Sequence, residues 1–130
     1  MDGGIYRGAT GGSRVRSITE FENLYIHRVP VDMRKSINGL TAIVQAEMKL
    51  DLRTSSLFIF CNQRRTHLKM IYFDRSGFAL WLKRLEDSRF PWPTNEDEDT
   101  VRIELKDLRM LLDGINVFTR FRDVHFEQVL

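Results

Sequence analysis

Three short apolar runs within residues 57–85 are the clearest pattern of hydrophobic and polar positions in the chain. They are rich in Phe, Ile, Tyr and Trp, and polar residues separate them. Runs of this composition and spacing are typical of an antiparallel β-meander. The turn predicted at residues 74–77 would place Phe73 opposite Phe78. Both faces of such a sheet are largely apolar, so each face requires a cover.

Two amphipathic helices are predicted to provide these covers. The first would begin with Asp32 as its cap and end near Lys49, because apolar residues recur every three or four positions between them. That stripe consists of Met33, Ile37, Leu40, Val44 and Met48. The second helix would begin at Glu104 and end with Gly114 as its C-cap.

The sequence therefore predicts the α+β class. We expect a single domain with an antiparallel β-meander of about four to five strands and two amphipathic helices. Residues 24–29 and 101–103 are candidates for the additional strands. Residues 1–20, which are rich in glycine and poor in apolar side chains, are predicted to form a flexible tail. The domain would span residues 21–116, and residues 117–130 would form a C-terminal extension.

Charge is distributed unevenly along the chain, although the net charge is only +2. Residues 96–99 form one acidic run, and the remainder is basic, which permits a polyanionic partner. A hydrophobic content of 42% and a charged content of 29% are ordinary for a globular domain. Cys61 stands alone, and no apolar run approaches the roughly 18 residues of a membrane span. We therefore expect a cytoplasmic protein without a membrane partner.

The candidate catalytic and metal-binding residues lack the companions that such sites need. Cys61 lies in an apolar run, as a core residue would, and no nucleophile signature accompanies it. The three histidines lack metal-ligand spacing and are interpreted as surface or interface residues. They are His27, His67 and His125. Asp32 and Glu47 resemble part of a nuclease set, but they would stand roughly 22 Å apart at the two ends of one helix. We predict no enzyme, no metal and no cofactor.

Cationic and amide side chains gather at the first connection of the meander. Arg64 and Arg65 would contact phosphates there, and amides at the same tip suit base edges if the hairpin enters a groove. Arg89 follows the third run of the meander together with further cations. The predicted nucleic-acid-binding residues are Arg34, Lys35, Asn62, Gln63, Arg64, Arg65, Lys69, Lys83 and Arg84. Basic hairpin tips also occur on proteins that never contact nucleic acid, and the residues alone leave both readings open.

Arg34 and Lys35 have a separate interpretation. They fall in the first turn of the predicted helix, where the dipole disfavours cations. Together with the free N–H groups of that turn they could hold an anion such as a phosphate oxygen. The alternative is that both side chains are solvated or are paired with a carboxylate such as that of Asp32.

Several blocks of the sequence resemble a known family at their relative spacing. The blocks are Val31-Asp32-Met33-Arg34-Lys35, Arg64-Arg65, Lys83-Arg84-Leu85 and Arg89-Phe90-Pro91-Trp92-Pro93. They are similar to TnpB, the short accessory protein of the bacterial insertion-sequence family numbered sixty-six. That protein is distinct from the RNA-guided nuclease of the same name. The resemblance covers about residues 24–115. It implies a role in transposition beside a separate, larger transposase that carries the strand-transfer chemistry.

Two hypotheses follow from the residues and the resemblance together. The first is a non-enzymatic accessory factor that binds the DNA of the element ends through the basic hairpin. The second is an adaptor that binds the transposase, or a second copy of itself, through an apolar face around Trp81, Trp92 and the Phe-rich C-terminal tail. For Trp92, which two prolines bracket, a position as a lid over the core is favoured over an exposed one.

Overall fold

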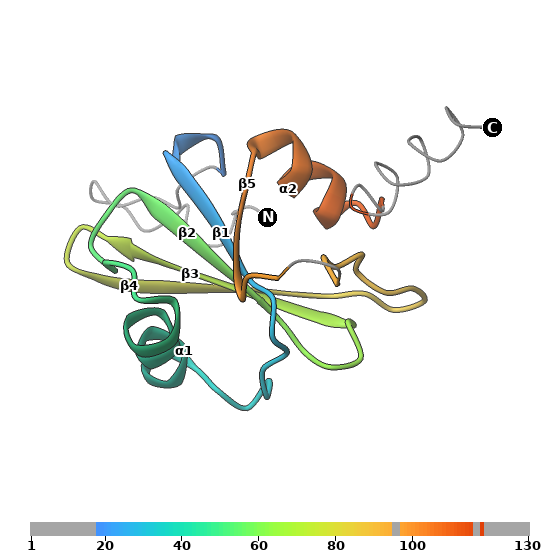
Figure 1. Ribbon diagram of the computed structural model, residues 1–130, viewed down its shortest axis with the longest axis horizontal. Helices are drawn as coiled ribbons and strands as arrows, with labels where there is room; N and C mark the ends of the chain where they lie inside the picture. Colours follow the sequence, from blue (N-terminus) through green and yellow to red (C-terminus); the bar gives the residue numbers. More distant parts are fainter. Residues whose placement is uncertain (1–17, 95–96, 116–117, 119–130) are drawn as a thin grey trace, which may run out of the picture.

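A five-stranded β-sheet with one helix against each face forms the centre of the protein (Figure 1). The computed structural model describes residues 18–94, 97–115 and 118. The strands are β1 (Asn23–His27), β2 (Ser56–Cys61), β3 (His67–Asp74), β4 (Gly77–Arg84) and β5 (Thr100–Ile103). The helices are a short 3-10 helix η2 (Ile18–Glu20), α1 (Ile37–Ile43), which continues as the π-helical turn η3 (Val44–Met48), and α2 (Leu105–Leu112). The predicted α+β class with two main helices is confirmed.

The strands lie in the order β4-β3-β2-β1-β5. β2, β3 and β4 form the predicted antiparallel meander, and Phe73 lies opposite Phe78 as expected. β5 is also antiparallel to β1. β1 pairs with β2 in parallel, because the chain between them crosses over through α1 and η3. The sheet is therefore mixed, with one parallel pairing that the sequence pattern did not predict.

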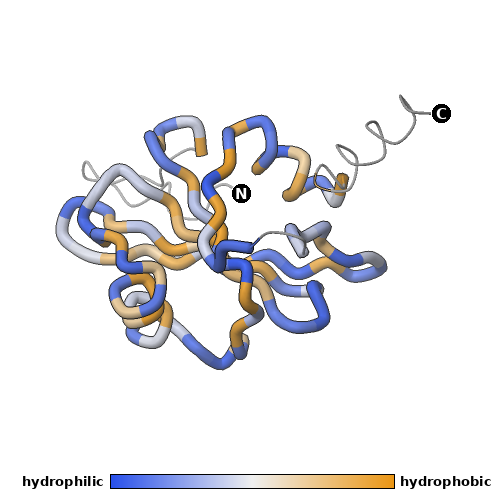
Figure 2. The backbone as a smooth tube through the Cα atoms, in the orientation of Figure 1, coloured by the Kyte–Doolittle hydropathy of each residue, from blue (hydrophilic) through white to orange (hydrophobic). Residues whose placement is uncertain are grey.

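The central strand β2 shows why the sheet needs two covers. All six of its residues are buried, and successive side chains point to opposite faces. Phe58 packs in one cluster with Leu40 of α1, whereas Ile59 packs in the other with Leu108 of α2. Figure 1 shows the two helices on opposite sides of the sheet, and Figure 2 shows hydrophobic positions along the strands between them. Each buried side chain of this size contributes about 1.5–3 kcal/mol.

Both ends of the described chain pack against the α2 side of the sheet. Ile18 of η2 and Phe118 contact the cluster that contains Leu108. Ordered structure therefore begins ahead of residue 21. The remaining residues of the predicted tail and of the predicted C-terminal extension lie outside the described residues.

The predicted start of the first helix at Asp32 is wrong. α1 begins at Ile37, with Ser36 in extended backbone as its N-cap. The Asp32 carboxylate instead accepts hydrogen bonds from the backbone N–H of Arg34 (2.8 Å) and from its guanidinium (2.6 Å). The N–H of Lys35 donates to the Asp32 carbonyl (3.0 Å), which closes a separate turn before the helix. These bonds to Arg34 lower the pKa of Asp32 to about 2.

His27 is buried at the end of β1, whereas a surface or interface position was predicted. Its ring lies 5.7 Å from that of Phe60, and its Nε2 lies 3.6 Å from a carboxylate oxygen of Glu47. Its Nδ1 has no hydrogen-bond partner among the described residues. Burial lowers the pKa of His27, and the negative charges of Glu47 and Asp99 only partly oppose that effect. The imidazole is therefore neutral in the folded protein at neutral pH.

We predict that His27 makes the protein less stable as the pH falls from about 7 to about 5. Its pKa in the folded state is below the unfolded value of 6.5, so the unfolded chain takes up the proton more readily in this range. Urea unfolding at both pH values tests this effect. The denaturation midpoint of the wild type should fall further than that of His27→Gln, and an equal fall in both proteins would contradict the assignment.

Candidate nucleic-acid interface

The loop of residues 62–66 joins β2 to β3 and is held by the side chain of its own first residue. The Asn62 Oδ1 accepts hydrogen bonds from the backbone N–H groups of Thr66 (2.9 Å) and His67 (3.0 Å). Its Nδ2 donates to the Thr66 hydroxyl at 3.0 Å. The Arg65 N–H donates to the Asn62 carbonyl at 3.0 Å and closes the tip of the loop. The Asn62 amide is thus engaged within the loop, and the predicted contact with a base would require it to leave these partners.

The loop is joined to the segment of residues 89–94, which follows β4. Arg65 has a left-handed backbone with φ of 63°, and its carbonyl accepts a hydrogen bond from the Phe90 N–H at 2.7 Å. The Phe90 side chain is fully buried in the core. Trp92 is also buried, and its Nε1 donates to the Arg28 carbonyl at 2.9 Å. These contacts hold the segment beside the loop at two points.

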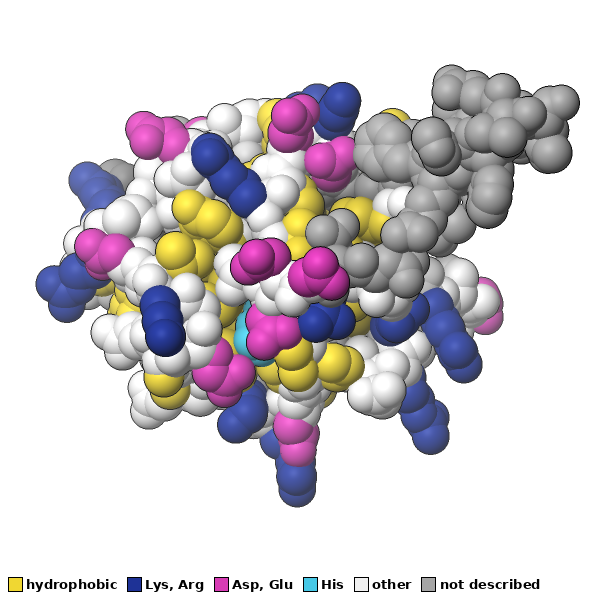
Figure 3. Space-filling model, viewed as in Figure 1, with side chains coloured by type: hydrophobic (Ala, Val, Ile, Leu, Met, Phe, Trp, Pro, Cys, Tyr) yellow, Lys and Arg dark blue, Asp and Glu magenta, His cyan; other side chains and the backbone are white. Residues whose placement is uncertain are grey.

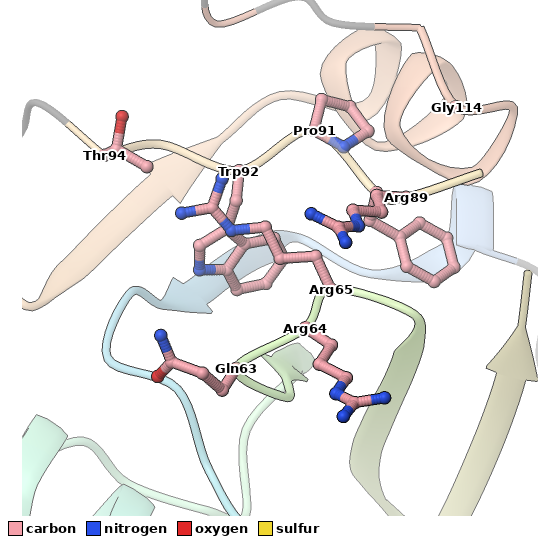
Figure 4. Close-up of a pocket in the computed structure, with 9 residues that line it drawn as sticks. Gln63, Arg64, Arg65, Arg89, Pro91, Trp92, Thr94 and Gly114 are labelled. Carbon is pink, nitrogen blue, oxygen red and sulfur yellow. The ribbon is translucent and has the colours of Figure 1, made fainter.

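A pocket of about 500 Å³ lies between the loop and this segment (Figure 4). Its lining residues are Gln63, Arg64, Arg65, Arg89, Phe90, Pro91, Trp92, Thr94 and Gly114. Figure 4 shows the side chains of Arg65 and Arg89 in the space between the two segments, whereas Arg64 extends from the loop in another direction. Two parts of the chain therefore bring the guanidinium groups of Arg65 and Arg89 to one hollow, and Arg64 lines its edge.

The three arginines that line the pocket differ from several other arginines in having no carboxylate partner among the described residues. Three exposed or half-buried arginines elsewhere each lie beside a carboxylate. They are Arg28 with Asp99 (3.0 Å), Arg34 with Asp32 (2.6 Å) and Arg84 with Glu86 (2.8 Å). Arg64, Arg65 and Arg89 form no ion pair with any carboxylate that the structure describes. Figure 3 shows dark-blue cationic side chains gathered at the lower right of the molecule. Uncompensated guanidinium groups at one site attract anions, and their fork of N–H donors matches phosphate oxygens.

The predicted lysine contacts are engaged in hydrogen bonds within the protein. The Lys69 Nζ donates to the carbonyl groups of Met33 (2.8 Å) and Lys35 (2.7 Å), which holds the turn before α1 against β3. The Lys83 Nζ donates to the Leu112 carbonyl (2.8 Å) at the C-terminus of α2, where a cation complements the helix dipole. Neither lysine lines the pocket.

Arg34, Lys35 and Arg84 are exposed but also lie outside the pocket lining. The interpretation of Arg34 and Lys35 as an anion site in the first turn of a helix is wrong, because both residues precede α1. The Arg34 guanidinium instead forms an ion pair with the Asp32 carboxylate. The weighed alternative, pairing with Asp32, describes Arg34 correctly.

The two predicted contact tryptophans differ in their positions. Trp92 is 5% exposed, which agrees with the favoured position as a lid over the core. Trp81 of β4 is half-buried and packs against the cluster on the α2 side. The neighbouring Leu82 is 54% exposed, more than any other large apolar side chain of the described residues.

Cys61 is a core residue, as predicted. Burial raises the pKa of its thiol to about 12, so the thiolate needed for nucleophilic attack is not formed at neutral pH. Within residues 18–94 and 97–115, no three His, Cys, Asp or Glu side chains lie close enough together to hold a metal ion. No helix in the same described ranges is long and apolar enough to cross a membrane.

Arg89 lines the pocket. The sequence places it with Lys83 and Arg84 among the cations of a polyanion-binding surface, but it is not among the predicted nucleic-acid-binding residues. It lies five residues beyond Arg84 along the chain, in an irregular segment without periodicity. Burial of Phe90 would have indicated the position of Arg89, because a buried Phe90 places the adjacent Arg89 beside the β2–β3 loop. That burial depends on the tertiary fold.

The sequence pattern of the family described as IS66 Orf2 like protein matches residues 22–121. The chain belongs to this family. It is 32% identical over 87 residues to uncharacterized protein y4jC of Sinorhizobium fredii (strain NBRC 101917 / NGR234). These aligned residues make up 67% of the chain and 74% of that protein. It is 36% identical over 85 residues to uncharacterized protein y4hO of the same strain, and these aligned residues make up 65% of the chain and 73% of that protein. No solved structure matches the chain.

Family membership confirms the resemblance seen in the sequence blocks. Membership of the IS66 Orf2-like family indicates an accessory role in the transposition of an insertion sequence. Both segments that form the pocket, residues 62–66 and 89–94, lie within the matched range.

We predict that Asn62→Ala lowers the free energy of unfolding by about 2 kcal/mol, because it leaves two backbone N–H groups without their acceptor. Asn62→Asp is the matched control, since its carboxylate retains an acceptor at the same position. It should lose less than about 1 kcal/mol. Urea unfolding of the three proteins checks the difference, and equal losses would show that the loop does not depend on the Asn62 oxygen.

Proposed function

We propose that this protein is a non-enzymatic, DNA-binding accessory factor for transposition of an insertion sequence. The observation that carries the proposal is that Arg65 and Arg89 enter one pocket and Arg64 lines its edge, with no carboxylate partner for any of the three among the described residues. Family membership supports this proposal through its link to transposition, and the partners that we propose are the element ends and the transposase. The proposal places the protein in the cytoplasm, with the DNA of its element.

The three guanidinium groups would contact phosphate oxygens. Arginine keeps its charge at any physiological pH and binds phosphate through two parallel N–H donors. Phosphate contacts carry no direct sequence information, so we expect binding that depends little on base sequence. Gln63 is exposed at the loop tip and is the amide left to contact a base edge, because Asn62 is engaged within the loop.

The other cations in the predicted interface have smaller roles in this proposal. Lys69 and Lys83 support the fold through their carbonyl partners. Arg34 and Arg84 are already paired with carboxylates, so moving them to phosphates would exchange one ionic contact for another. Lys35 is exposed and could add one phosphate contact at the rim.

Affinity for duplex element ends should fall steeply with salt. Three phosphate contacts predict a slope of about −3 in a plot of log K against log salt concentration. Arg64→Ala combined with Arg65→Ala should reduce this slope to about −1 and weaken binding at low salt by about tenfold or more. Fluorescence anisotropy between about 50 and about 200 mM salt measures both quantities.

The matched control is Lys106→Ala combined with Arg109→Ala. It removes the same charge from exposed positions of α2 that do not line the pocket. This control should keep the wild-type slope. Equal loss of affinity in both double variants would mean that net charge, and not the pocket, governs binding. Absent or salt-insensitive binding by the folded wild type would overturn the DNA-binding proposal.

A second candidate function is that of an adaptor that docks on the transposase without contacting DNA. The observation that favours it is β4, an edge strand of eight residues with Leu82 largely exposed. An edge strand presents backbone N–H and C=O groups that a strand of another protein can pair with. Trp81, adjacent to Leu82, would add apolar contact area from the other face of the same strand.

Salt separates the two candidates, since pairing of apolar strands is little affected by ionic strength. An adaptor complex with the transposase should persist at about 1 M salt and survive the double change at Arg64 and Arg65. It should be weakened by Leu82→Lys, because charged side chains on an edge strand oppose pairing. Analytical ultracentrifugation of the mixture measures the complex. Dissociation at high salt, or indifference to Leu82→Lys, would count against the adaptor.

A further inference from the structure

We propose that the pocket takes the phosphorylated end of a DNA strand, and not a nucleotide within an intact duplex. The inference rests on the proposed function and names the part of the DNA that the pocket would hold. Four properties of the site carry it: the volume, the lining, the charge and the fixed backbone of its walls.

The volume limits what can enter. About 500 Å³ falls within the roughly 300–1,000 Å³ of sites that hold one small molecule, so the pocket has room for about one nucleotide. A duplex carries its phosphates on the outside of a much wider cylinder. Nucleotides within the duplex can therefore only touch the rim of the pocket, whereas the phosphate at the end of a strand can enter it.

The lining offers charge and hydrogen bonds, but no exposed aromatic face. Phe90 and Trp92 border the pocket, yet they are only 1% and 5% exposed, and the Trp92 N–H already donates to the Arg28 carbonyl. Stacking of bases on exposed rings, which many single-strand binding proteins use, has no surface available here. The pocket is thus suited to phosphate and sugar, and a strand end would be recognised without regard to its base.

A terminal phosphate suits the guanidinium groups of Arg65 and Arg89 better than a phosphodiester does. A phosphate monoester carries about −1.5 to −2 charges at neutral pH and exposes three oxygens. A diester carries a single charge and two free oxygens. Arg65 and Arg89 provide positive charge from two segments of the chain, and no described carboxylate forms an ion pair with them. The monoester therefore gains more from this arrangement.

The walls of the pocket are in place before a ligand arrives. The Arg65 backbone is fixed by its bonds to Asn62 and Phe90, and the Arg89 backbone is fixed by the adjacent buried Phe90. Only the side chains need to be ordered when an anion binds, and a smaller ordering cost leaves more of the contact energy for affinity.

The test compares three internally labelled duplexes of the same sequence with the full chain, by fluorescence anisotropy at low salt. One has both ends closed by hairpins, one has free 5′-hydroxyl ends, and one has 5′-phosphate ends. We expect the phosphorylated duplex to bind about tenfold more tightly than the closed one, as expected for one additional charge-assisted contact. Arg89→Gln should bring this ratio near one, whereas Arg109→Gln, outside the pocket, should preserve it.

Each outcome bears on one proposal. Equal, salt-dependent affinity for closed and phosphorylated duplexes would overturn the end-binding inference and leave the proposed DNA binding intact. Absence of binding to all three duplexes by the folded protein would overturn the proposed function. If Arg89→Gln still preferred the phosphorylated duplex over the closed one, the pocket would not be the site that recognises the phosphate, and the inference would be overturned. A further measurement needs no variant. Inorganic phosphate should displace the phosphorylated duplex from the protein more effectively than chloride does at equal ionic strength. Equal displacement by the two anions would contradict the inference.

Discussion

Burial of β2 at every one of its positions is the constraint on which the rest of the structure depends. A strand without a solvent-facing side must have an apolar layer on both faces of its sheet. α1 and η3 form one layer, and α2 is only part of the other. The second cluster is completed by Phe90 and Trp92, which come from an irregular segment. The segment that carries Arg89 therefore lies beside the β2–β3 loop because the core requires its aromatic side chains there.

The elements that the sequence predicted well are those whose burial repeats with a fixed period. The meander follows from alternating apolar runs, and the Phe73–Phe78 pairing follows from a two-residue turn. The first helix was predicted four residues too long at its start, because Met33 continues the apolar spacing although its backbone lies in a turn. That boundary is set by a short-range hydrogen bond, which the Arg34 N–H donates to the Asp32 carboxylate. The spacing of apolar residues carries no information about this bond. The parallel pairing of β1 with β2 depends on contacts between distant residues, which local patterns do not report.

The candidate site was predictable in part for the same reason. Arg64 and Arg65 stand together in a loop, so their accumulation of charge is visible in the sequence. Whether a cation is free to meet a ligand depends on partners far along the chain. Lys69 donates a hydrogen bond to the Met33 carbonyl, 36 positions away in the sequence, and Lys83 donates one to the Leu112 carbonyl, 29 positions away. Residue type supplies the charge, and the tertiary structure determines which charges are already compensated.

The bonds that close the pocket also connect it to the order in which the chain can fold. β2, β3 and β4 are neighbours in sequence and pair through short connections, whereas β1 must reach β2 and β5 across longer stretches. Closing longer loops has a greater entropic cost and slows folding. During synthesis the basic loop would emerge before the segment that forms the opposite wall, and Trp92 reaches the Arg28 carbonyl across 64 positions. A nascent chain would thus display the arginines of the loop early and acquire the opposite wall of the pocket only when residues 89–94 have joined Arg65 and Arg28.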